Sequence, residues 1–171
     1  MNNKGQLLIE SLVAITVIVI SILGIFTLVS RSLSLNRVVN DQYVGTYLAA
    51  EGIEVIKNIV DTNVLTHCEP WNQGVNTAGE YQVNYDTQLF GSQTLTQTNG
   101  PAQLNFDGTM YSHYSGGQPT KFYRSVTLDP ITANHLKVVS LVQWETRGNA
   151  NFETVLEDHF YNWRPTGINC Q

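Results

Sequence analysis

The chain has 171 residues, of which 13% are charged, and its formal net charge at pH 7 is −5. Nine Lys and Arg residues against 14 Asp and Glu form no basic stripe for neutralising phosphates, which argues against nucleic acid as a main partner. The length accommodates a single globular domain with a modest core beside one membrane anchor.

An uncharged stretch runs from Ser11 to Ser30, interrupted only by Ser, Thr and Gly24 among apolar residues. A helix of this length reaches ~30 Å, the thickness of a bilayer core, so the sequence predicts a single membrane-spanning helix. A removed secretory signal peptide is the alternative. The apolar run exceeds the ~7–15 residues of such a signal, and residues 30–34 offer no convincing cleavage site. The short leader favours a cytoplasmic N-terminus, with the rest of the chain outside.

Glu10 stands at the beginning of this span. A carboxylate next to a membrane-spanning segment is costly to insert, so its presence suggests a partner that neutralises it. The alternative is a charge that complements the exposed amides and dipole of a helix N-terminus, worth ~0.3–1 kcal/mol.

Beyond Ser30 the pattern becomes amphipathic, with apolar residues at intervals of three, four or seven and charged residues between them. No proline precedes Pro70. The sequence therefore predicts one helix from about Leu7 to about Val60, whose second half lays a single stripe on a soluble domain. The predicted stripe consists of Leu35, Val39, Tyr43, Thr46, Ala50, Ile53 and Val60.

Gly24, Gly45 and Gly52 are predicted weak points of this helix, each costing up to ~1 kcal/mol against Ala. The helix is expected to end near residues 61–63, inside a connecting loop over residues 61–80 that is rich in Asn, Pro and Gly.

Short segments with strand character follow, and the last two are joined by a hairpin loop at residues 147–151. Phe122, Val126 and Leu128 are expected on one face of their strand, as are Leu136, Val138, Val142 and Trp144 of the next. The predicted strands cover residues 80–85, 104–114 with a turn at Asp107-Gly108, 121–128, 136–144 and 152–163. The fold class is therefore α+β, a long N-terminal helix on an antiparallel sheet.

Aromatic residues near the C-terminus are interpreted as core and sheet packing, with a ligand platform or subunit contact as the alternative for those that prove exposed. They are Trp144, Phe160, Tyr161 and Trp163.

Cys68 and Cys170 are the only cysteines. In an exported domain an even pair suggests a disulfide, worth up to ~4.7 kcal/mol for a loop of ~100 residues, and two unpaired thiols are the alternative.

The N-terminus resembles the class III signal of type IV pilins and type II secretion pseudopilins. That family has a short basic leader ending in Gly, then an aromatic residue, Thr-Leu-Ile-Glu and a long apolar helix. Here the pattern stands as Lys4-Gly5, Gln6 and Leu7-Leu8-Ile9-Glu10. Gln6 replaces the aromatic residue and Leu7 replaces the Thr, which favours a minor subunit over the abundant one.

The resemblance implies a processing and assembly route. A prepilin peptidase would cut after Gly5 and methylate the new N-terminus at Gln6. An inner-membrane platform would then extract the subunit from lipid and stack its helix with other pilin or pseudopilin subunits, where Glu10 would pair with an N-terminal amine. The corresponding regions are a leader 1–5, a span and filament core 6–30, an amphipathic half-helix 31–63 and a β domain 64–171.

No motif for catalysis, cofactor binding or metal binding is apparent, so the sequence predicts neither an enzyme nor a cofactor. The four histidines stand far apart without metal-ligand spacing; they are His67, His113, His135 and His159. The triplet His67-Cys68-Glu69 is weak support for zinc. Asp61-Thr62-Asn63 and Asp107-Gly108 are interpreted as turns, because neither has the spaced ligands of a calcium loop.

These features together predict a minor pilin or pseudopilin, stored in the cytoplasmic membrane and polymerised into a filament at the cell surface or in the periplasm. Such filaments serve adhesion, motility, DNA uptake or protein secretion. The alternative is an N-terminally anchored binding module that does not polymerise.

Overall fold

The protein is described by a computed structural model over residues 4–67, 70–87, 95–146 and 150–163. The chain forms two compact units, Met1–Asp41 and Gln42–Gln171. The first unit is helical throughout its described residues, and the second contains the rest of the same helix together with the sheet.

Helix α1 spans Lys4–Thr62 and is followed by a π-helical turn, Asn63–His67. The continuous helix predicted from the sequence is therefore confirmed, and it extends further at both ends. Buried Asn63 donates hydrogen bonds from Nδ2 to the carbonyl oxygens of Trp71 (3.3 Å) and Gln73 (2.9 Å). These bonds hold the end of the helical segment against the turn that follows it. The loop predicted to begin at residue 61 was wrong over its first seven residues, because residues 61–67 are helical.

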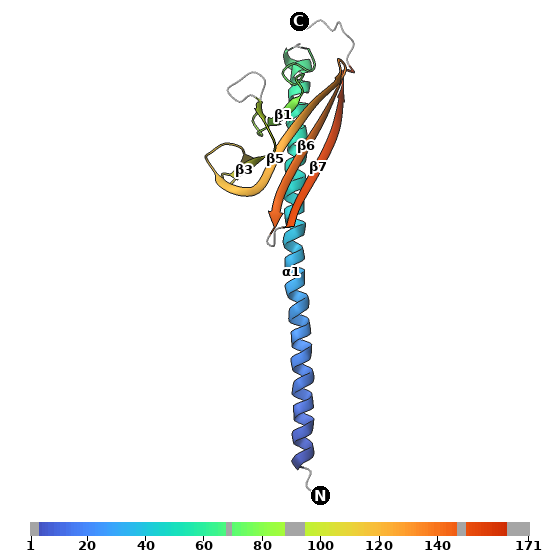
Figure 1. Ribbon diagram of the computed structural model, residues 1–171, viewed down its shortest axis with the longest axis vertical. Helices are drawn as coiled ribbons and strands as arrows, with labels where there is room; N and C mark the ends of the chain where they lie inside the picture. The colour runs from blue at the N-terminus through green and yellow to red at the C-terminus, as the bar shows by residue number, and fades with distance from the viewer. Residues whose placement is uncertain (1–3, 68–69, 88–94, 147–149, 164–171) are drawn as a thin grey trace. The chain divides into compact units, whose positions relative to one another are not determined.

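The described strands form one antiparallel sheet in which β5 is central (Figure 1). Strand β6 pairs along one edge of β5 and also pairs with β7, whereas β1 and β3 share the other edge of β5. The strands are β1 Gly79–Gln82, β2 Thr96–Thr98, β3 Ala102–Phe106, β4 Tyr111–Ser112, β5 Gln118–Thr132, β6 His135–Thr146 and β7 Ala150–Tyr161.

Every region predicted to be a strand contains one, and the α+β fold class is confirmed. The predicted turn between β3 and β4 is also confirmed. Asp107 Oδ1 accepts hydrogen bonds from the backbone N–H groups of Thr109 and Met110, both at 2.8 Å, and Gly108 adopts a φ of 104° that favours glycine. Strand β2 was not predicted, because its sequence, Thr-Gln-Thr, has no apolar alternation.

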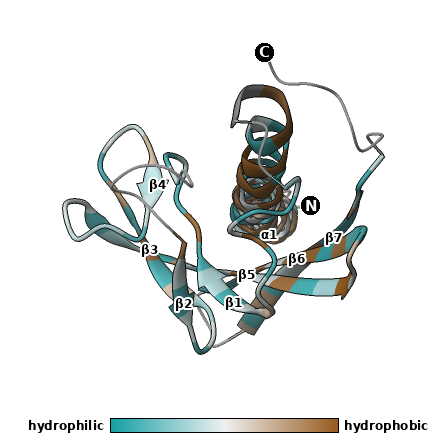
Figure 2. Cartoon of the chain, turned by 90° about the horizontal axis from the view of Figure 1, so that it is seen from above, coloured by the Kyte–Doolittle hydropathy of each residue, from teal (hydrophilic) through white to brown (hydrophobic). Residues whose placement is uncertain are grey.

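The second part of α1 covers one face of the sheet (Figure 2). Alternate residues of β5 and β6 point to that face and are buried, as the period of two predicts. The faces predicted for these strands are confirmed, and the structure adds two polar members, Arg124 and Ser140. The buried residues on that face are Phe122, Arg124, Val126 and Leu128 of β5, and Leu136, Val138, Ser140, Val142 and Trp144 of β6.

The stripe predicted for the second half of α1 was wrong for most of its members. Leu35, Val39 and Tyr43 are exposed, whereas Val60 is buried and Ile53 packs partly buried against the core. The residues that α1 buries in the second unit are Gly45, Leu48, Ala49, Gly52, Val55, Ile56, Ile59 and Val60. They also recur at intervals of three and four, but on another face of the helix.

Close approach of helix and sheet explains this choice of face. A Cβ atom on Gly45 would lie 2.6 Å from Cζ3 of Trp144, and one on Gly52 would lie 2.7 Å from Oγ of Ser140. Both distances are far below van der Waals contact, so only glycine fits at these positions. Gly45 and Gly52, two of the glycines that the sequence presented as weak points, are therefore points of close packing between α1 and the sheet.

Candidate functional site

The residues predicted to carry processing and assembly lie at the beginning of α1. Gly5, Gln6 and Glu10 are helical and exposed. No atom lies within 4 Å of the position that a Cβ on Gly5 would occupy. The side chains of Gln6 and Glu10 and the open space beside Gly5 are therefore not covered by other described residues.

Glu10 has no hydrogen-bond or ion-pair partner among the residues that the structure describes. Leu7, Leu8 and Ile9 beside it are each at least 65% exposed. The carboxylate thus belongs to an apolar surface on which the described residues supply no cation. Removal of this segment from water would leave a charge that the described part of the fold does not compensate.

The apolar stretch that follows is exposed on all sides. Its large side chains, including Ile15, Ile20 and Phe26, are exposed by about half or more, and α1 is long and apolar enough to span a membrane. The polar side chains in it satisfy themselves within the helix. The hydroxyl groups donate to backbone carbonyls three or four residues earlier, at 2.7–2.9 Å, in the pairs Ser11 to Leu8, Thr16 to Val13, Ser21 to Val17 and Thr27 to Leu23. Such bonds reduce the cost of placing hydroxyls in lipid or in a dry helix bundle.

The second unit holds its own buried charge, which sequence reasoning missed. Arg124 of β5 is fully buried, and its Nη1 donates to the Leu48 carbonyl (2.9 Å) and to Glu51 Oε1 (3.0 Å) of α1. Its Nη2 donates to the Val83 carbonyl at 2.6 Å. Burial lowers the pKa of Arg124, whereas the charge of Glu51 and the hydrogen bond to it raise that pKa. This group links α1, β5 and the segment after β1, and its alternation with Phe122 and Val126 was the available signal.

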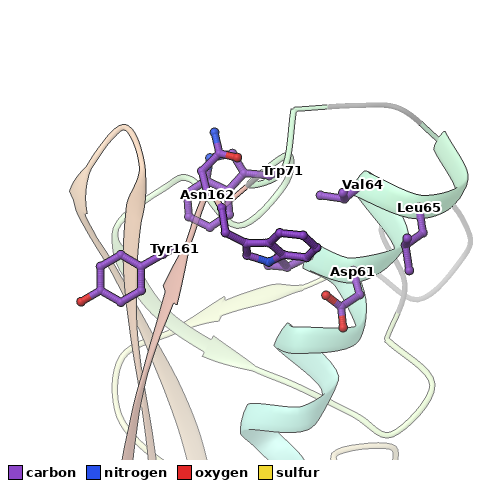
Figure 3. Close-up of a pocket in the computed structure, with 8 residues that line it drawn as sticks. Asp61, Val64, Leu65, Trp71, Tyr161 and Asn162 are labelled. Atoms are coloured by element: carbon purple, nitrogen blue, oxygen red, sulfur yellow. The ribbon is translucent and has the colours of Figure 1, made fainter. Parts of the chain in front are cut away.

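A small pocket lies between the end of α1 and the end of β7 (Figure 3). Asp61, Val64 and Leu65 form one side of it, and Tyr161 and Asn162 form another. Its volume is about 50 Å³, well below the ~300–1,000 Å³ of pockets for small organic ligands. It is therefore no candidate active site.

The aromatic residues near the C-terminus divide into two groups. Trp144 is buried and Phe160 packs against the core, as predicted. Tyr161 and Trp163 are 56% and 78% exposed, so neither is a core residue, although Tyr161 stacks on His135 across the sheet as a sheet-packing residue would. The alternative interpretation, a ligand platform or subunit contact, therefore applies to Tyr161 and Trp163.

Cys68, Cys170 and Glu69, and hence the proposed disulfide, lie outside the described residues. Among the residues that the structure describes, no group of three or more His, Cys, Asp or Glu side chains is arranged to hold a metal ion. Two histidines that stand far apart in the sequence nevertheless meet in the fold, because the β6–β7 pairing places His135 Nε2 2.7 Å from His159 Nδ1.

Comparisons with family models, with curated protein sequences and with solved structures gave no significant match.

Proposed function

We propose that this chain is a minor pilin or pseudopilin, a structural subunit of a type IV pilus-like filament. The observation that carries the proposal is Glu10, which has no partner among the described residues and stands at the beginning of an apolar half-helix exposed on every side. A folded α+β unit follows on the same chain, so one half of the helix remains available for contacts outside it.

The proposed route begins in the cytoplasmic membrane, with the N-terminus inside and residues 11–30 in lipid. A prepilin peptidase cuts after Gly5 and methylates Gln6, both of which are exposed. An assembly platform then transfers the subunit from lipid into a stack of like helices, where the apolar side chains stay out of water.

Glu10 contributes to the transfer of the subunit from the bilayer into the stack of helices. In a stack of apolar helices an unpaired carboxylate costs several kcal/mol, and the amine created at Gln6 is a cation that can offset this cost. Pairing therefore favours the filament over the bilayer and fixes the axial position of one subunit against the next.

The test is incorporation of a Glu10→Ala variant into sheared filaments. We expect normal membrane insertion and about tenfold less incorporation, which corresponds to about 1.4 kcal/mol. Glu54→Ala is the matched control, because Glu54 is an exposed glutamate of the same helix that pairs only with Lys57 at its surface. Equal incorporation of the two variants would show that Glu10 does not direct assembly.

A second candidate is an anchored binding module that does not polymerise. The exposed Tyr161 and Trp163 favour it, because aromatic side chains are common at binding surfaces. This candidate predicts that the chain keeps its leader and is absent from filaments of cells that process other prepilins.

A further inference from the structure

Two histidines that are 24 residues apart in sequence meet on the surface of the β6–β7 hairpin. In the strand register His135 is opposite Tyr161, and Lys137 is opposite His159. The histidines are thus diagonal neighbours on the face of the sheet away from the core. Their ring nitrogens, His135 Nε2 and His159 Nδ1, lie 2.7 Å apart.

The hydrogen bond made by the other ring nitrogen of His159, Nε2, determines which histidine donates the hydrogen bond between the two rings. His159 Nε2 lies 3.0 Å from Glu157 Oε1, a carboxylate that only accepts hydrogen bonds. Neutral His159 therefore carries its proton on Nε2 and presents a lone pair at Nδ1. His135 donates its Nε2–H to that lone pair.

Both rings are held in this orientation. The His135 ring stacks on Tyr161, with centroids 4.4 Å apart and planes at 14°. The carboxylate of Glu157 is held by a second contact, from its Oε2 to Lys137 Nζ at 3.5 Å. Both carboxylate oxygens of Glu157 therefore have a partner, His159 on one side and Lys137 on the other.

We propose that His135 and His159 form a surface site for a divalent transition-metal ion of the class that prefers imidazole ligands, namely Zn²⁺, Cu²⁺ or Ni²⁺. The geometry resembles the arrangement in which a carboxylate orients a metal-binding histidine through its other ring nitrogen. His159 Nδ1 and His135 Nε2 are the protein ligands, and water completes the coordination.

The change needed to admit an ion is small. Tetrahedral zinc with Zn–N bonds of ~2.0–2.1 Å separates two ligating nitrogens by ~3.3 Å. The rings must therefore move apart by ~0.6 Å, which side-chain rotation provides at an exposed site. His135 must also change from the tautomer with its proton on Nε2 to the one with its proton on Nδ1, because Nε2 becomes a metal ligand. Each histidine still carries one proton, so metal binding to the neutral pair releases none.

The test is calorimetric titration of the full-length chain in detergent with ZnCl₂ at pH 7.5, using protein without a polyhistidine tag. We expect one Zn²⁺ per chain. His135→Asn and His159→Asn should each bind at least tenfold more weakly. Glu157→Gln, a positioning variant, should weaken binding by about tenfold because it reduces the basicity of His159.

His67→Asn is the matched control, because His67 lies next to Cys68 and Glu69, the other place in the sequence with adjacent potential ligands. It should bind Zn²⁺ as the parent chain does. The proposal is overturned if the parent chain does not bind, if His135→Asn and His159→Asn bind equally well, or if only His67→Asn loses the ion.

A measurement on the unsubstituted chain guards against variants that fail to fold. Long-range proton–nitrogen NMR spectra should show His135 changing from the Nε2–H to the Nδ1–H form on addition of Zn²⁺, while His159 keeps its Nε2–H. Zinc binding without these changes would place the ion elsewhere.

Discussion

Residues 11–30 of α1 expose large apolar side chains in every direction, whereas residues 45–60 of the same helix bury one face against the sheet. The buried face combines Gly45, Ala49 and Gly52 with large apolar residues such as Leu48 and Ile56, whereas Tyr43 and Tyr47 point outward. Small residues therefore allow the helix to approach the sheet closely at some positions, and large apolar residues of the same face fill the core between them.

The charges of the two regions differ in the same way. Glu51 of the packed region has a partner within the fold, Arg124, at 3.0 Å. Glu10 of the exposed region has none among the described residues. A charge compensated within the fold contributes to stability, whereas a charge without a partner in the fold is available for assembly.

Replacement of Glu51 should have the largest effect on stability. Glu51→Ala leaves the buried guanidinium of Arg124 without a counter-charge, and we expect a loss of about 3 kcal/mol in the free energy of unfolding. Glu54 lies three residues further along the same helix, and its ion pair with Lys57 is exposed. Glu54→Ala should therefore change the free energy of unfolding by no more than ~0.5 kcal/mol. Denaturant titration followed by tryptophan fluorescence reports on the sheet unit, since all three tryptophans follow residue 70. Equal losses in the two variants would contradict the distinction.

The glycines give an intermediate effect. Gly45→Ala and Gly52→Ala should each lower stability by about 1–3 kcal/mol, because the added methyl group forces Trp144 or Ser140 to move. Gly24→Ala is the control from the exposed region, where no atom lies within 4 Å of the added carbon. It should raise helix stability by up to ~1 kcal/mol. A gain at all three positions, measured by circular dichroism during thermal unfolding, would mean that the helix and sheet do not approach closely.

The smallest effect is a dependence on pH that belongs to the sheet unit. Burial, with a smaller contribution from the charge of Arg124, lowers the pKa of His113 from 6.5 to about 4. The unfolded chain takes up a proton near pH 6.5 and the folded chain does not, so stability is complete above pH 6.5 and declines as the pH falls towards 4. We expect a decline of roughly 1 kcal/mol for this partly exposed ring. His113→Gln should flatten the curve over that range, and an unchanged slope would exclude His113 as its source.

The sequence was sufficient for the helix, for the position of most strands along the chain and for the inward faces of β5 and β6, because those features follow from local periodicity and turn residues. It was insufficient for the packed face of α1. The predicted stripe, which included Val39 and Tyr43, was based on hydropathy. Gly45 and Gly52 lie inward because Trp144 and Ser140 stand directly opposite them on the sheet, and only the structure shows those neighbours.

Contacts between residues far apart in the sequence could not be predicted from local patterns either. Arg124 pairs with Glu51, which is 73 residues away, and His135 contacts His159 because of the register of the β6–β7 hairpin. For the assembly segment, the structure gives the exposure of Gly5, Gln6 and Glu10, whereas their proposed roles come from the resemblance of the N-terminus to prepilin signals.

The most direct test of the proposed role of the exposed half-helix is the mass of the intact chain, recovered by mass spectrometry from the membrane and from sheared filaments of cells that process prepilins. We predict a filament form that begins at Gln6, with or without one methyl group. A chain that begins at Met1 or Asn2 in the membrane of such cells, and is absent from their filaments, would contradict the account.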